Sequence, residues 1–392
     1  MTFDAMWADL QPVGRDRRSG GYRRFAWTAE DGALREWFTG EAAGRGLDVV
    51  PDRAGNLWAW WGDPDADGPG LVVGSHLDSV PDGGAFDGPL GVVSALAALD
   101  VLRARGWTPS RPLGIAVFSD EEGARFGVAC AGSRIITGAL DPDRARSLTD
   151  ADGTTVAEAM AAAGHDPVQV GPDQTTLARV GTFVELHVEQ GRALVDAPDE
   201  AAVGVASAIW PHGRWRLDLR GRADHAGTTR LEDRDDPMLH LAEAITAARR
   251  AAGEHDALAT IGKLRVEPGG VNAIPSRITA WLDARGPVEA DVRAVVAAVG
   301  AAAGSEPVEE SWTGSTAFDA GLRDRLAALL AAPVLPTGAG HDAGILSAAG
   351  IPAAMLFVRN PTGVSHSPEE HAEPADCHRG VEALARVVEE LG

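Results

Sequence analysis

One stretch of the sequence, residues 71–102, constrains the fold more than any other. It opens with a short run of apolar and small residues that predicts a buried strand. His76 and Asp78 follow where this strand should end, and the glycine-rich loop after them carries Asp87. Apolar residues then recur at helical spacing until Gly106, which can end the helix. A strand, a polar loop and a helix in this order predict an open α/β sheet, whose sites lie at the carboxyl ends of its strands.

The polar residues of this loop are good ligands for a divalent metal. Neutral imidazole and carboxylate groups bind zinc and similar ions, so His76, Asp78 and Asp87 predict a metal site. The alternative is a solvated loop in which the aspartates act only as caps. The rest of the chain favours the metal site, because residues of the same kind follow other predicted strands.

The strand and helix pattern continues along the chain. Buried strands are predicted over 113–119, 182–187 and 353–358, with helices and loops between them. Glu121 and Glu122 follow the first of these strands. This rhythm predicts a mostly parallel or mixed sheet with helices on both faces.

The pattern changes near residue 209. A half-exposed strand begins there, and the elements over 209–316 follow the order strand, helix, strand, strand, helix, strand. This order is the ferredoxin-like split βαβ pattern. We therefore expect an inserted second domain over 209–316, and a discontinuous first domain made of 1–208 and 317–392.

The composition excludes some classes of partner. The formal net charge of the 392-residue chain is −22, whereas nucleic acids and anionic membranes are bound by basic surfaces. Two cysteines are too few for a disulfide framework. Neither a signal peptide nor an apolar run long enough to span a membrane is visible. We therefore expect a cytoplasmic protein without a nucleic-acid or membrane partner.

Histidines and carboxylates recur at or near the predicted strand ends. They are His76, Asp78, Asp87, Glu121, Glu122, His187 and His366. One such histidine alone is more often structural than a ligand, but the joint pattern suits two metal ions that share a carboxylate. Such a pair lowers the pKa of a bridging water and polarises a carbonyl, as a hydrolase requires. A nearby glutamate can accept the proton of the water, and Asp78 is placed to fix the tautomer of His76.

Other signals are weaker and have ordinary structural explanations. Of the consecutive Glu121 and Glu122, one can bind a metal while the other serves as a base, unless both lie in a solvated turn. His225 lies in the predicted second domain, away from any ligand cluster in the sequence. Arg285 can bind a carboxylate with two parallel hydrogen bonds or be a surface charge. Asp342 opens a predicted helix, and its simplest interpretation is an N-cap.

Several segments together resemble a known superfamily. They are GSHLDSVPDGGAFDGPLGV, SDEEGARFG, FVELHVEQG, DHAGTT, VNAIPSR, GAGHDA and GVSHSPEE. This set is similar to the dinuclear zinc aminoacylase and carboxypeptidase superfamily, and more closely to its hydantoinase/carbamoylase branch. That branch contains N-carbamoyl-L-amino acid hydrolases, β-ureidopropionases and allantoate amidohydrolases. The resemblance covers almost the whole chain and implies a zinc-hydrolase catalytic domain with an inserted dimerisation or lid domain.

The resemblance assigns the metal ligands. It implies two divalent ions per subunit, expected to be zinc, with manganese, cobalt or nickel as alternatives. His76, Asp87 and His187 would hold one ion. The other would be held by Glu122, His366 and the same Asp87, which bridges. Glu121 would be the general base.

The resemblance also assigns residues to the substrate. His225 would reach the active site of a partner subunit and stabilise the oxyanion, in a homodimer formed through the second domain. Gln190, Asn272 and Arg285 match family positions that contact substrate, and the arginine would take the α-carboxylate. Gly363 matches a position that lines the same pocket. The implied partner is therefore a small carboxylate-bearing molecule.

The implied reaction is hydrolysis of a linear ureido or amide C–N bond in an N-carbamoyl-L-amino acid or an allantoate-like substrate. Two departures, at Pro211 and at Arg230–Leu231, lie in the predicted second domain and concern the identity of the substrate. The alternatives are a peptidase or an N-acyl or N-formyl amino acid deacylase of the same superfamily, and an inactive binding homologue.

Overall fold

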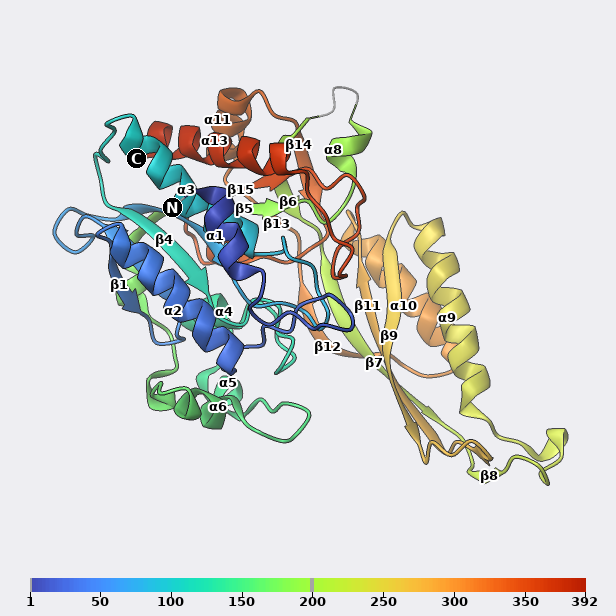
Figure 1. The fold of residues 1–392 in the computed structure, drawn as a ribbon. Coiled ribbons are helices and arrows are strands. Elements are labelled where there is room, and N and C mark those ends of the chain that lie inside the picture. The colour runs from blue at the N-terminus through green and yellow to red at the C-terminus, as the bar shows by residue number, and fades with distance from the viewer. Residues whose placement is uncertain (1, 198–200) are drawn as a thin grey trace. The chain divides into compact units, whose positions relative to one another are not determined.

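The computed structural model describes residues 2–197 and 201–392, which form two compact units (Figure 1). Unit 1 comprises Met1–Ser207, Ala317–Leu335 and Gly340–Gly392. Unit 2 comprises Ala208–Thr316 and Pro336–Ala339.

A mixed sheet forms the centre of unit 1. Its strands are β1 (Asp48–Pro51), β2 (Leu57–Trp61), β3 (Gly70–His76), β4 (Leu113–Phe118), β5 (Val180–Val188), β6 (Val203–Ile209), β13 (Thr316–Ala317), β14 (Val334–Thr337) and β15 (Ala353–Val358). They lie in the order β1-β2-β4-β3-β5-β15-β6-β13, and β14 also pairs with β6. The four central strands β4, β3, β5 and β15 are parallel, whereas β1, β2 and β6 pair antiparallel at the sides.

The central strands are buried because they are apolar on both faces. Every residue of β3, β4 and β15 is buried, as expected for parallel strands covered by helices. In β5, Leu186 faces Gly380 of α13 (Pro374–Leu391), while the preceding Glu185 accepts a hydrogen bond from Ala343 of α12 (Asp342–Ala348). Successive side chains of a strand point to opposite faces, so helices cover both faces of this sheet.

The remaining helices of unit 1 complete its layers. They are α1 (Phe3–Leu10), α2 (Ala29–Gly44), α3 (Pro89–Ala104), α4 (Ala131–Thr137), α5 (Pro142–Ser147), α6 (Val156–Ala162), α7 (Gln174–Ala178), α8 (Ala193–Asp196) and α11 (Ala320–Leu330), with a 3-10 turn at Pro167–Gln169. The side chains of α3 are almost all buried, and α3 packs against β3, β5 and α13. A single apolar cluster joins α1, α2, α3 and α13 to the sheet.

Unit 2 consists of a four-stranded antiparallel sheet and two helices. Its elements are β7 (His212–Arg220), α9 (Pro237–Glu254), β9 (Leu258–Glu267), β11 (Arg277–Arg285), α10 (Glu289–Ala303) and β12 (Val308–Thr313). The strands lie in the order β12-β7-β11-β9. A small ribbon of β8 (Asp224–His225) and β10 (Ala273–Ile274) and a 3-10 turn at Leu231–Asp233 also belong to this unit.

Most predicted elements are present within one to three residues of their expected ends. The mixed α/β class is confirmed, and unit 2 has the predicted order of strands and helices. Strands β6, β13 and β14 were not predicted, because β13 and β14 have only two and four residues and the buried positions of β6 do not alternate. Within residues 2–197 and 201–392, no helix combines the length and the apolar character that crossing a bilayer requires.

Candidate active site and metal centre

The candidate site lies in unit 1, where the parallel strands β3, β4 and β5 end. His76 is the last residue of β3, and His187 lies one residue before the end of β5. Glu121 and Glu122 follow β4 within four residues. Because parallel strands end at the same edge of the sheet, residues far apart in sequence are brought together there.

Asp87 lies between the two strand histidines. Its Oδ1 atom is 3.5 Å from Nε2 of His76 and 3.2 Å from Nε2 of His187, and all three residues are buried. Glu370 holds the loop, because its Oε1 accepts hydrogen bonds from the backbone N–H groups of Phe86 and Asp87 at 3.0 Å. The first predicted ligand group is therefore assembled around one carboxylate.

Gly88 allows this loop to approach His76. Its φ angle is +83°, and a Cβ atom there would lie 2.4 Å from Cε1 of His76. Both the backbone conformation and the space therefore require glycine at this position.

The second predicted ligand group also contains Asp87. Nε2 of His366 is 3.5 Å from Oδ2 of Asp87 and 3.6 Å from Oε2 of Glu122. His366 is half-exposed, whereas the two carboxylates are buried. Asp87 thus offers one oxygen to each group, which is the arrangement that a bridging ligand requires.

The donor atoms of these residues fit a pair of divalent cations. Nδ1 of His76 faces the carbonyl of Asp78 at 3.2 Å, and Nδ1 of His187 faces the carbonyl of Val188 at 2.9 Å. Their Nε2 atoms, and Oε1 of Glu122, are buried and have no hydrogen-bond partner among the described residues. A histidine that engages one ring nitrogen and directs the other at a carboxylate is oriented as a metal ligand.

The charges of the site also favour a cation. Burial raises the pKa values of Glu121 and Glu122 well above the usual range, and neighbouring carboxylates add to the rise. Burial acts in the same direction on Asp87, but His187 and His76 hold its pKa well below the usual range. Closely spaced buried carboxylates repel one another, and a bound cation relieves that repulsion.

Glu121 lies beside the ligand groups without belonging to either. Its Oε2 is 3.7 Å from Nε2 of His76, and its Oε1 accepts a hydrogen bond from Sγ of Cys130 at 3.4 Å. Asp78 accepts hydrogen bonds from the backbone N–H groups of Glu121 at 3.2 Å and Glu122 at 3.0 Å. Its Oδ1 is also 3.4 Å from Nδ1 of His76, so Asp78 ties the end of β3 to the segment after β4.

Two further predicted residues lie at this cluster or near it. Nε2 of Gln190 donates a hydrogen bond to Oδ2 of Asp87 at 2.8 Å and lies 3.4 Å from Nε2 of His366. Gly363 is three residues before His366 and has a φ angle of +69°. A Cβ atom there would lie 2.3 Å from Cγ of Arg192. Gln190 therefore faces the metal ligands, while Gly363 forms part of the loop that presents His366.

Comparison with known proteins identifies the family. Residues 72–390 match the sequence profile of peptidase family M20/M25/M40. The chain belongs to this family. M20 relatives with a curated name include the N-carbamoyl-L-amino acid amidohydrolase of Geobacillus stearothermophilus, which is 35% identical over 99% of this chain and 98% of its own. The allantoate amidohydrolase of Escherichia coli is 30% identical over 97% of this chain and 95% of its own.

Solved structures agree with this assignment. An amidase of the hydantoinase/carbamoylase family from Burkholderia vietnamiensis has a TM-score of 0.89 and 28% identity, over 99% of this chain and 97% of that one. A structure of AtUAH in complex with (S)-hydroxyglycine has the same TM-score and identity, over 99% and 96%. The predicted membership of the hydantoinase/carbamoylase branch of the M20 family is confirmed.

The other predicted residues lie in unit 2 of this M20 protein and fall into two groups. His225 and Asn272 are exposed and adjacent, because Ala226 N–H donates a hydrogen bond to the carbonyl of Asn272 at 3.0 Å. Arg285 is the last residue of β11, and its guanidinium donates to Asp283 and to the carbonyl of Gly338. Arg285 and the ribbon lie at opposite ends of β11, whose nine residues span about 26 Å. One copy of unit 2 therefore cannot present all three side chains to one small molecule.

The structure adds residues that the sequence analysis did not select. His341, Glu185 and His187 form a third buried group of possible ligands. The ring of His341 is 4.5 Å from that of His187, and neither of its ring nitrogens has a hydrogen-bond partner in the described part of the chain. Glu185 could have been found, because it lies two residues before His187 and therefore on the same face of β5.

The expected N-cap role of Asp342 is wrong. His341 occupies the N-cap position of α12, and Asp342 is the first helical residue. Asp342 is fully buried and accepts a hydrogen bond from Oγ of Ser133 at 2.5 Å. It therefore links α12 to α4 instead of capping its own helix.

Proposed function

We propose that this protein is a metal-dependent amidohydrolase that cleaves a linear ureido or amide C–N bond in an N-carbamoyl-L-amino acid or an allantoate-like substrate. The observation that carries the proposal is Asp87, which lies between two histidine-containing ligand groups with Glu121 beside them. The names of the M20 relatives support the class of substrate.

His76, Asp87 and His187 would hold one divalent ion, and Asp87, Glu122 and His366 the other. Zinc binds nitrogen and oxygen donors of this kind, and manganese, cobalt and nickel also bind them. When bound, such a pair supplies an activated water and a Lewis acid for the scissile carbonyl. Asp78 fixes the orientation of His76 from the opposite ring nitrogen.

Glu121 would move the proton. Its carboxylate accepts a proton from the attacking water and delivers it to the nitrogen that leaves. The raised pKa of Glu121, which burial causes, suits a group that must hold this proton between the two events. Its position beside His76 keeps it within reach of the site without occupying a ligand position.

The α-carboxylate of the substrate would be bound by Arg285, whose planar guanidinium matches a carboxylate. Gln190, Asn272 and Gly363 would complete the pocket. Because strand β11, which is about 26 Å long, separates Arg285 from the ribbon that carries His225 in the same copy of unit 2, we assign His225 and Asn272 to the active site of a partner subunit. His225 would stabilise the oxyanion there.

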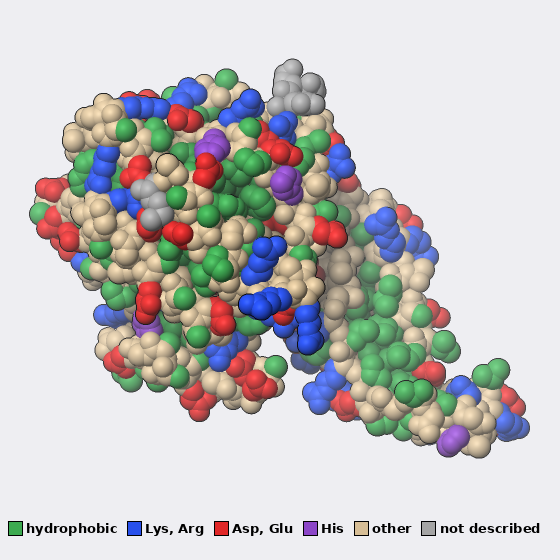
Figure 2. All heavy atoms as spheres, in the orientation of Figure 1, with side chains coloured by type: hydrophobic (Ala, Val, Ile, Leu, Met, Phe, Trp, Pro, Cys, Tyr) green, Lys and Arg blue, Asp and Glu red, His purple; other side chains and the backbone are tan. Residues whose placement is uncertain are grey.

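A homodimer through residues 209–316 is supported by exposed apolar residues and by a long strand at the edge of the sheet of unit 2. Figure 2 shows apolar side chains gathered on unit 2. The exposed large apolar residues of this unit are Leu231, Met238, Leu239, Ile245, Leu258, Leu264, Val271, Val288 and Val308. Strand β9 is ten residues long and lies at the edge of its sheet. Such an edge is protected when a second copy covers it.

A substrate panel tests the proposed reaction. Metal-loaded enzyme would be assayed with allantoate, N-carbamoyl amino acids of several side chains, carbamoyl-β-alanine, N-formyl and N-acyl amino acids, and dipeptides. Ureido substrates should be turned over fastest, and a chelator should abolish the activity. Preference for a dipeptide or an acyl amino acid would replace the proposal by a peptidase or deacylase. Binding without turnover of any compound would indicate an inactive homologue.

Mixing of variants tests the shared site. His225→Ala and Glu121→Gln subunits should each be nearly inactive alone. After subunit exchange, activity should return if His225 acts across the interface, because one of the two sites then has both residues. No recovery after verified exchange would place His225 outside the partner's site.

A further inference from the structure

We propose that Asp52 and Asn56 are positioning residues for Glu121. They form a clamp that holds the backbone after β4 and thereby directs the glutamate side chain. This inference rests on the proposed role of Glu121 as the general base. Asp52 and Asn56 lie in the turn between β1 and β2, far from the metal ligands in the sequence.

Asp52 organises the turn. Its Oδ1 accepts hydrogen bonds from the backbone N–H groups of Ala54 at 2.9 Å and Asn56 at 3.0 Å. Its Oδ2 accepts from Nδ2 of Asn56 at 2.8 Å and from Nε1 of Trp58 at 2.9 Å. Four donors converge on one carboxylate, so the side chain of Asn56 is held with its amide oxygen directed away from Asp52.

That oxygen holds the end of β4. Oδ1 of Asn56 accepts a hydrogen bond from the N–H of Ser119 at 2.8 Å, and Asn56 is fully buried. Oγ of Ser119 donates to the carbonyl of Gly55 at 2.9 Å and accepts from the guanidinium of Arg35. The carbonyl of Ser119 accepts from the N–H of Gly132 at 2.9 Å. Every polar group of Ser119 is therefore bonded.

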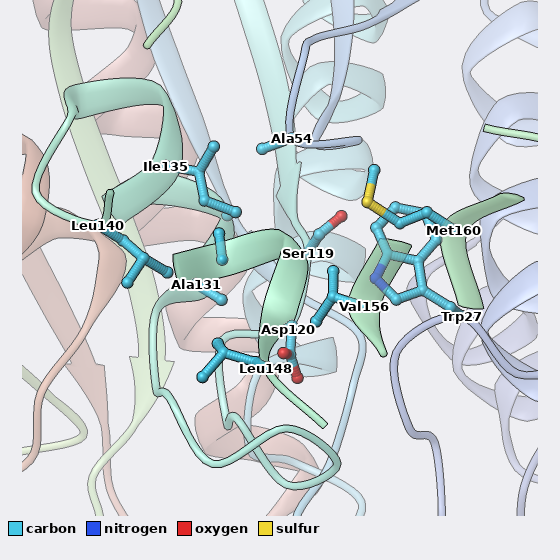
Figure 3. Close-up of a pocket in the computed structure, with 12 residues that line it drawn as sticks. Trp27, Ala54, Ser119, Asp120, Ala131, Ile135, Leu140, Leu148, Val156 and Met160 are labelled. Atoms are coloured by element: carbon cyan, nitrogen blue, oxygen red, sulfur yellow. The ribbon is translucent and has the colours of Figure 1, made fainter. Parts of the chain in front are cut away.

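Helix α4 closes over the clamp. A Cβ atom on Gly132 would lie 2.1 Å from Oδ1 of Asn56, so glycine is required for this contact. Figure 3 shows Ser119 beside the turn that contains Ala54. The side chain of Asp120 is directed away from this turn, toward apolar side chains such as Leu148. The chain thus reverses its side-chain direction between the clamped residue and the next one.

The residue between the clamp and Glu121 is strained. Asp120 has a φ angle of +52°, and a non-glycine residue in the left-handed region costs about 1–3 kcal/mol and persists only where its surroundings determine it. Asn56 holds the preceding residue, and Asp78 holds the following N–H groups. Asp120 is therefore fixed from both sides. A strained backbone that aims Glu121 explains why hydrogen bonds from Asn56 and Asp78 hold the chain on both sides of Asp120.

Two single variants and their combination test the clamp. Asn56→Ala removes the oxygen that accepts the hydrogen bond of the Ser119 N–H. Asp52→Asn replaces one of the two carboxylate oxygens at the turn, each of which accepts two hydrogen bonds, by an NH2 group. In the double variant Asp52→Asn/Asn56→Asp, the introduced amide can again donate to the introduced carboxylate, which can again accept from Ser119. Trp58 Nε1 alone loses its acceptor in this exchange. Asp173→Asn is the matched control, because Asp173 is a buried carboxylate that accepts from N and Oγ of Thr176 at the start of α7.

The measurements are kcat, KM, metal ions per subunit and Tm, on metal-loaded enzyme with the best substrate of the panel. Each single variant should lower kcat, on the order of 10²-fold if the glutamate moves by about 1 Å. KM and metal content should stay unchanged. The exchanged double variant should recover much of the lost kcat. The control should lower Tm without changing kcat.

Three outcomes would overturn the inference: single variants that lose Tm but keep kcat, single variants that lose metal in step with activity, and a double variant no better than the singles. Glu121→Gln is measured in parallel to separate the two proposals. If Glu121→Gln retains full turnover, the proposed function of Glu121 fails. If it abolishes turnover while Asn56→Ala does not change kcat, only the clamp fails.

Discussion

Exchange of one glutamate for glutamine should separate proton transfer from metal binding at this site. Glu121 and Glu122 are consecutive, both are buried, and glutamine has nearly the shape of glutamate. Glu122 lies in a ligand group with Asp87 and His366, whereas Glu121 belongs to none of the groups found in the described chain. Glu121→Gln and Glu122→Gln therefore make the same chemical change at neighbouring positions, but we expect different consequences.

Glu121→Gln should retain both metal ions, because no assigned ligand is lost. An amide cannot accept the proton of the attacking water, and general acid–base catalysis contributes about 10²–10⁴-fold. This loss in kcat corresponds to about 3–5 kcal/mol of transition-state stabilisation. The contact of Cys130 Sγ with the side-chain oxygen can be kept, so Tm should change little.

Glu122→Gln should instead release one ion per subunit at low metal concentration. Its kcat should recover in part as metal is added, whereas that of Glu121→Gln should not. The assay measures kcat and bound metal together over a metal titration. Turnover of Glu121→Gln close to that of the unmodified enzyme would refute the base assignment. A loss of metal in that variant would show that Glu121 is a ligand.

Three further predictions follow from single contacts. Gly88→Ala should place a Cβ atom against His76, so this variant should lose bound metal as well as stability. Gly106 also has a positive φ angle, but no atom lies within 4 Å of the position of its Cβ. Gly106→Ala should therefore lose only about 1–2 kcal/mol of stability in denaturant titrations. Arg285→Lys should raise KM for a carboxylate-bearing substrate more than it lowers kcat, since an ammonium cannot form two parallel hydrogen bonds; an unchanged KM would remove Arg285 from the pocket. Burial raises the pKa of Asp52 from an ordinary 3.8 to about 6 in the folded protein. Its contribution to stability is therefore complete below about pH 4 and is lost as the pH rises through 6, a change of about 3 kcal/mol. Chemical denaturation of metal-free protein should detect this change, and Asp52→Asn should abolish it.

Local sequence determined most of the secondary structure of this protein. Apolar periodicity distinguishes strand from helix within a few residues, and it predicts the strands β3, β4, β5 and β15 and the order of the main elements in unit 2. The sequence also indicated that the polar residues at the ends of the parallel strands would meet, since such ends share one edge of a sheet. The sequence alone therefore predicts that His76, Glu122 and His187 lie together.

Only the tertiary structure decided which of these side chains contact one another. Asp87 contacts His187 and His366 across 100 and 279 positions of the chain, and such contacts depend on strand register and helix packing, which leave no local pattern. For the same reason the buried pair of His341 and Glu185 and the bond between Asn56 and Ser119 were not predicted. Local patterns also misjudged Asp342, because a cap is defined by backbone angles at the helix start and not by residue type.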